Sequence, residues 1–96
     1  MTEKNWKNKK GTKERHCGCG TWKQHWINNS GKQWPTKCSV AGCNNSATFG
    51  AHIINKNVSG EYIVPACESC NQLDSEFDLK YGTTLVSANK QKTCGQ

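Results

Sequence analysis

The chain lacks the long apolar segments that a membrane protein needs. Its 96 residues are only 33% hydrophobic and the mean hydropathy is −0.85, and no stretch approaches the roughly 20 apolar residues that span a bilayer. The opening sequence, MTEKNWKNKKGTKERH, also lacks the apolar core of a signal peptide. We therefore expect a cytoplasmic protein that does not associate with membranes.

A low apolar content limits the hydrophobic core that a chain of this length can bury. Small domains of this kind are commonly held by disulfides or by a structural metal ion, and the chain contains 7 cysteines. Disulfides are rare in a reducing cytoplasm, where closely spaced cysteines more often bind metal. The sequence also contains no glycine-rich phosphate-binding loop and no Ser-His-Asp order, so it favours a metal-stabilised domain.

Acidic residues are few: Asp and Glu number 7, against 13 Lys and Arg, which gives a formal net charge of +6. Much of the excess lies in residues 1–15, which we expect to form a flexible basic arm, followed by a single zinc-binding domain over residues 16–96. A basic arm attracts phosphates, so DNA is a candidate partner. The alternative is a solvated tail without a ligand.

Local patterns predict a small α+β fold with short helices and a β-hairpin. Thr21 and Gln24 form a candidate capping box, and runs of β-branched residues bounded by turn residues predict strands. The predicted elements are a helix over residues 21–29, strands over 48–54 and 61–64 that form the hairpin, a short helix that begins at or near Cys67, and a strand over 83–89.

Two close cysteine pairs give the most specific signal for metal binding. Cys38 and Cys43 enclose four residues that include a glycine, and Cys67 and Cys70 form a C-x-x-C at the start of a predicted helix. Such pairs predict a tetrahedral structural zinc site with four cysteine ligands. The alternative, a pair of disulfides, leaves the close spacings unexplained.

Three cysteines lie outside this tetrad, namely Cys17, Cys19 and Cys94. His25, on the first predicted helix, would complete a second set of four zinc ligands with them. We therefore expect one zinc ion, with a second as a hypothesis. In the alternative interpretation, Cys94 lies on a frayed chain end and His25 packs against Trp22.

The segments CSVAGC, GAHI and YIVPACESCN together resemble the HNH nuclease family, whose ββα-metal unit is a treble-clef zinc finger. The resemblance covers residues 38 to about 74 and implies a zinc-stabilised treble clef at the centre of the domain. The flanking segments resemble small uncharacterised bacterial and phage proteins with an HNH-like centre, a resemblance that implies no particular activity.

The resemblance to HNH nucleases also implies roles for individual residues. His52 takes the place of the general base that activates water, and Asn71 matches a common variant of the last motif position. The acidic residue that usually precedes the histidine and holds a catalytic cation is Ala51 here, and the central asparagine is Tyr62. The carboxylates that lie near enough in sequence to substitute are Glu61, Asp74 and Asp78.

Two functions follow from this incomplete motif. The first is a zinc-binding HNH-like domain that binds nucleic acid or a protein partner without cleavage, with His52 as a buried structural residue. The second is a DNA endonuclease that uses Mg²⁺ or another divalent cation, with His52 as the general base. His52 as a direct zinc ligand is a third interpretation of that residue. We expect the clustered tryptophans to form core rather than a platform for stacking bases.

Overall fold

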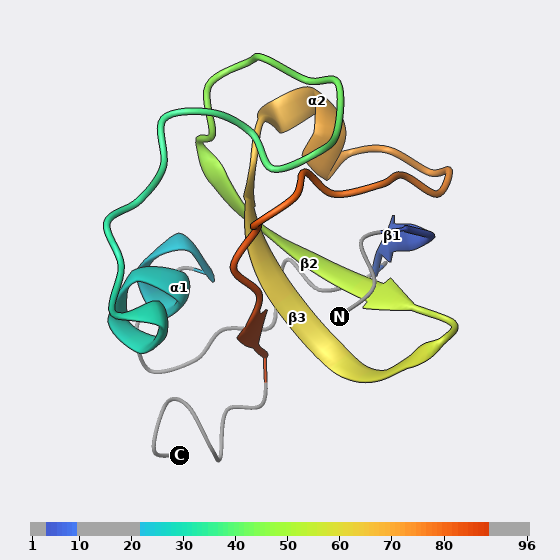
Figure 1. The fold of residues 1–96 in the computed structure, drawn as a ribbon, viewed down its shortest axis with the longest axis horizontal. Coiled ribbons are helices and arrows are strands. Elements are labelled where there is room, and N and C mark those ends of the chain that lie inside the picture. Colours follow the sequence, from blue (N-terminus) through green and yellow to red (C-terminus); the bar gives the residue numbers. More distant parts are fainter. Residues whose placement is uncertain (1–3, 10–21, 89–96) are drawn as a thin grey trace.

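The computed structural model describes residues 4–9 and 22–88. These residues form a four-stranded antiparallel sheet of order β1-β2-β3-β4, flanked by two helices (Figure 1). The elements are β1 (Trp6–Asn8), α1 (Trp22–Ser30), β2 (Phe49–Asn55), β3 (Val58–Ala66), α2 (Glu68–Asn71) and β4 (Val86–Ser87). The predicted small α+β architecture is confirmed, and no described helix has the length and apolarity needed to cross a membrane.

The β2-β3 hairpin is the longest regular feature of the sheet. Its second strand begins at Val58 instead of near residue 61, because the turn is tighter than the sequence predicts. The Asn55 side chain accepts a hydrogen bond of 2.8 Å from the backbone N–H of Asn57, an arrangement in which asparagine reverses the chain within two residues. The strand predicted over residues 83–89 is also present, but β4 covers only two residues.

The two faces of the hairpin pack against different parts of the molecule. Successive side chains of a strand point to opposite faces, and Ala51 and Ile53 of β2 lie in one buried cluster with Val64 of β3. The intervening His52 pairs in register with Ile63, whose side chain packs in a second cluster with residues of α1 and β4. The hairpin therefore separates an α1 face from the face that carries the cysteines.

Helix α1 lies directly against the start of β2, and Gly50 makes this approach possible. A Cβ atom at Gly50 would come within 2.6 Å of the backbone of both Trp22 and Lys23. The helix is fixed further along by Trp26, which is 3% exposed and donates a 3.0 Å hydrogen bond to the carbonyl of Thr84. The predicted role of the tryptophans in the core is therefore confirmed for Trp26.

The flexible arm predicted for residues 1–15 is wrong for residues 4–9. Trp6 is fully buried, exchanges backbone hydrogen bonds of 2.9 and 2.7 Å with Phe77, and lies on β1, which pairs with β2. The prediction failed because the segment was judged by its many lysines. A single large aromatic side chain can bury enough apolar area to stabilise a short strand. Residues 1–3 and 10–15 of the predicted arm lie outside the described residues.

Replacement of Trp6 by alanine should destabilise the whole domain, because it would remove the largest fully buried side chain of the core. We expect a loss of about 3–5 kcal/mol in the free energy of unfolding, measured by denaturant titration at a fixed zinc concentration. Tyr81→Ala is the control, since Tyr81 is 95% exposed. Equal unfolding midpoints for the two variants would show that β1 contributes nothing to the fold.

Candidate metal centre

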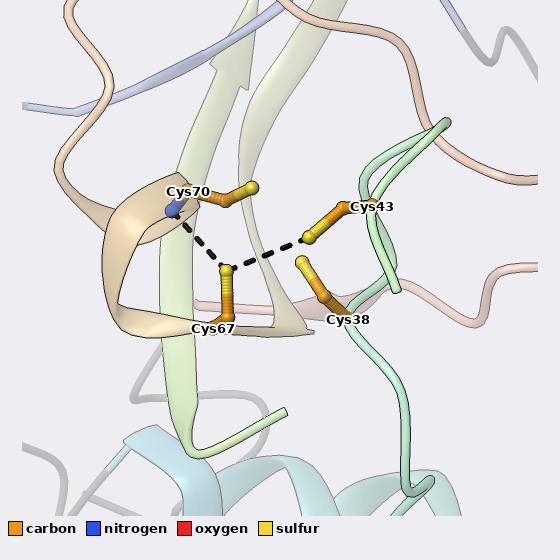
Figure 2. Close-up of side chains that lie close together, drawn as sticks. All are labelled: Cys38, Cys43, Cys67 and Cys70. Atoms are coloured by element: carbon orange, nitrogen blue, oxygen red, sulfur yellow. Dashed lines mark hydrogen bonds between the residues drawn. The ribbon is translucent and has the colours of Figure 1, made fainter. Parts of the chain in front are cut away.

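Four cysteine side chains point toward one another at the end of the hairpin (Figure 2). The sulfur atoms of Cys38, Cys43, Cys67 and Cys70 all lie within 4.8 Å of one another. A tetrahedral site with Zn–S bonds of about 2.3 Å separates its sulfurs by about 3.8 Å, and the sulfurs of Cys43 and Cys67 are 3.7 Å apart. The structure therefore brings together the four cysteines that the spacing predicted as ligands.

The first pair is held by a tight turn before β2. The backbone N–H of Cys43 donates to the carbonyl of Val40 at 3.1 Å, and that of Cys38 donates to the carbonyl of Asn45 at 2.9 Å. Gly42 has a φ of +83°, which places it in the left-handed region where glycine carries no steric penalty. These contacts fold the CSVAGC segment back on itself, so that both sulfurs face α2.

The second pair is positioned by the end of β3 and the start of α2. Cys67 is the N-cap of this helix, and its sulfur accepts hydrogen bonds from the backbone N–H of Cys70 at 3.4 Å and from the Asn45 side chain at 3.8 Å. The predicted helix start near Cys67 is confirmed. Because a cap sulfur and a first-turn sulfur lie on the same side of a short helix, the C-x-x-C presents both thiols to the first pair.

The pKa values of the thiols differ because their surroundings differ. Burial alone would raise the pKa of Cys67, but the hydrogen bonds to its sulfur from Cys70, Cys43 and Asn45 outweigh it and lower the pKa to about 7. Burial raises the pKa of Cys38 and of Cys70. Of these three thiols, Cys67 is therefore the one that most readily forms a thiolate at neutral pH, the form that ligates metal.

The donor set restricts the metals that fit. Four sulfur atoms in a tetrahedral arrangement suit zinc or iron, whereas magnesium and calcium require oxygen ligands. The four thiols are not joined in disulfides, and three of them, Cys38, Cys67 and Cys70, are at most 8% exposed. A closed site of this kind, without an open coordination position, is typical of structural rather than catalytic metal.

His52 lies on the α1 face of the sheet, away from the cysteines. Its side chain is 2% exposed, and Nε2 lies 2.6 Å from a carboxylate oxygen of Glu61. The other oxygen of Glu61 is 3.8 Å from the ammonium of Lys9, and the ring meets Trp22 edge-on at 5.0 Å. His52 does not belong to the group of candidate metal ligands among the described residues.

The remaining HNH-like positions do not meet at His52. Asn71 belongs to α2, whose Cys70 packs in the buried cluster on the opposite face of the hairpin. Tyr62 also points to that opposite face, where its ring meets Trp6 edge-on at 5.8 Å, and its hydroxyl donates to the carbonyl of Ser59. Glu61 therefore contacts His52, whereas Tyr62 lies on the opposite face of the hairpin.

The hypothesis of a second zinc site depends on residues that the structure does not describe. Cys17, Cys19 and Cys94 lie outside the described residues, so the site stays a prediction. His25 is fully buried, with Nε2 at 2.7 Å from the carbonyl oxygen of Ser87. Its ring meets Trp22 edge-on at 5.2 Å, the packing that the alternative interpretation expects.

Comparison with known proteins identifies no family. No family model, no curated protein and no solved structure matches the chain. The HNH resemblance therefore depends on the motif residues alone, and the function must be argued from the cysteine cluster and its surroundings.

Removal of metal is expected to unfold the centre of the domain, because ligand binding supplies folding free energy when the site joins two separate chain segments. Circular dichroism and NMR spectra should lose their native form after chelation and regain it when zinc is returned. Cys38→Ser and Cys67→Ser should have the same effect, while Tyr81→Ala should leave the spectra unchanged. A native spectrum from fully demetallated protein would contradict this prediction.

Zinc affinity should fall as the pH is lowered, since the metal displaces protons from thiols. The raised pKa values of Cys38 and Cys70 and the pKa of about 7 for Cys67 predict that these three thiols alone release about two to three protons per zinc at pH 7. Calorimetric titration in buffers with different ionisation enthalpies measures this number. Release of fewer than about two protons would mean that not all four thiols bind as thiolates.

Proposed function

We propose that this protein is a zinc-binding module with an HNH-like treble-clef centre that binds nucleic acid without cleaving it. The observation that carries the zinc assignment is the convergence of four thiols within 4.8 Å. The order of its parts also supports the proposal: a cysteine turn, a β-hairpin, and a short helix that begins at the second cysteine pair. Zinc is the metal that most often fills closed four-cysteine sites.

The surroundings of His52 argue against phosphodiester cleavage. Hydrolysis of this kind needs a cation beside the base to stabilise charge on the phosphate. The side chain of the preceding residue, Ala51, has no oxygen that could bind a cation, and the residue is only 2% exposed. The His52 side chain is itself buried against Glu61, which leaves little room for a phosphate and a water molecule. We therefore assign His52 a structural role, in which it joins β2 to β3.

A cleft on the surface of the domain supports nucleic acid as the ligand. It measures about 500 Å³ and lies between the segment before the first cysteine pair and the loop before β4. Lys32, Lys37, Lys80 and Tyr81 line it, and none of the described residues that line it is acidic. A groove that combines cations with an exposed aromatic ring is typical of proteins that bind single-stranded nucleic acid.

One observation favours the second candidate, a DNA endonuclease. The contact of 2.6 Å between His52 and Glu61 resembles the way a carboxylate orients a histidine that acts as a general base. In that case Glu61 would supply the carboxylate that is missing at position 51. The substrate could reach His52 only if α1 moved away from the sheet locally. Cleavage assays on the wild-type protein and the His52→Ala variant decide between the two candidates.

Binding to a short fluorescent single-stranded oligonucleotide tests the first candidate. We expect Lys32→Glu combined with Lys37→Glu to weaken binding at least tenfold and to reduce its dependence on salt, since each neutralised phosphate contributes about −0.7 to the log-log slope for single strands. Lys56→Glu is the matched control, because Lys56 is an exposed lysine in the turn of the hairpin. Equal weakening by the control would contradict a role for the cleft.

The same preparations, incubated with supercoiled plasmid and magnesium or manganese, test cleavage. We expect no nicking by the wild-type protein or by His52→Ala. Nicking that the His52→Ala variant abolishes would establish the endonuclease in place of the first candidate.

A further inference from the structure

The segment that follows α2 returns to the first cysteine pair and packs along it. The backbone N–H of Ala41 donates to the carbonyl of Asp78, and that of Lys80 donates to the carbonyl of Ser39, both at 2.8 Å. Val40 and Leu79 form an isolated antiparallel bridge between these bonds. The backbone of Lys80 is therefore fixed beside the cysteine turn by contacts that do not depend on its side chain.

The side chain of Lys80 then reaches across the turn to the metal centre. Its ammonium donates a hydrogen bond of 2.6 Å to the carbonyl oxygen of Cys43. The neighbouring Leu79 is 4% exposed and packs in the same buried cluster as the cysteines. Lys80 is itself half-buried, so its charge is screened by solvent less than that of an exposed lysine.

A cation at this position matters because of the charge of a zinc site with four cysteines. One Zn²⁺ and four thiolates carry a net charge of −2, and burying that charge is costly unless hydrogen bonds and cations offset it. The donors that reach the sulfur of Cys67, the Cys70 backbone and the Asn45 side chain, are neutral. Lys80 adds a full positive charge on the side of Cys43.

We infer that Lys80 is a positioning residue of the metal centre, whose ammonium, held on the Cys43 carbonyl, raises zinc affinity by offsetting the charge of the four thiolates. The inference rests on the zinc binding proposed above. Partners of this kind, which contact a ligand residue and not the metal, typically change metal affinity by about 10- to 100-fold. Lys80 also lines the cleft described above, so its role in the metal centre is tested by zinc affinity in the absence of nucleic acid.

Competition with a chromophoric zinc chelator measures the dissociation constant in a set of variants. Lys80→Met should weaken zinc binding by about 10- to 100-fold, whereas Lys80→Arg, which keeps the charge, should restore most of the affinity. Acetylation of Lys80 by genetic encoding keeps an N–H donor but removes the charge, and it should behave like Lys80→Met. Lys56→Met is the control, since Lys56 is an exposed lysine in the turn of the hairpin.

Circular dichroism at saturating zinc checks that each variant is folded. Wild-type affinity in the acetylated protein, or equal losses in Lys80→Arg and Lys80→Met, would overturn the inference, because either result would show that charge does not act at this position. If the wild-type protein binds zinc and Lys80→Met binds it with the same affinity, the inference about Lys80 is overturned, while the proposed zinc site stands. Failure of the wild-type protein to bind zinc at all would overturn both.

Discussion

The fold depends on the contact between two chain segments through four sulfur atoms at one end of a hairpin. Cys38 and Cys43 precede β2, whereas Cys67 and Cys70 follow β3, so a bound metal would close the hairpin at the end opposite its turn. The chain is only 33% hydrophobic, and a core built from so few apolar residues supplies limited stability. A metal ion bound to the four cysteines would hold the sheet, α2 and the cysteine turn in one arrangement.

The hairpin also separates two chemically distinct regions. One face carries the cysteine cluster together with Ala51, Ile53 and the buried Trp6 of β1. The other carries His52, whose ring lies between the Glu61 carboxylate and the edge of Trp22. In this arrangement the sheet stands between the histidine and the cysteines, so His52 takes no part in the cysteine cluster.

The sequence was sufficient to predict the features whose signal is local. The two close cysteine pairs predicted the cluster, and the hairpin and the helix start at Cys67 followed from residue patterns of a few positions. Features that depend on long-range packing were missed. The lysines around Trp6 led to the prediction of a flexible basic arm, yet Trp6 pairs with Phe77, which lies far along the chain. No local pattern shows that Lys80 reaches the turn at Cys43, because that contact requires the chain to return after α2.

X-ray absorption spectroscopy at the zinc edge measures the identity, number and distance of the metal's ligands directly. The sample is the protein with Cys17, Cys19 and Cys94 changed to serine, so that only the thiols of the described cluster are present. Four sulfur neighbours at about 2.3 Å, with one zinc per chain, would establish the site on which the fold depends. Substoichiometric zinc in the folded protein, or a shell that includes nitrogen or oxygen, would contradict it.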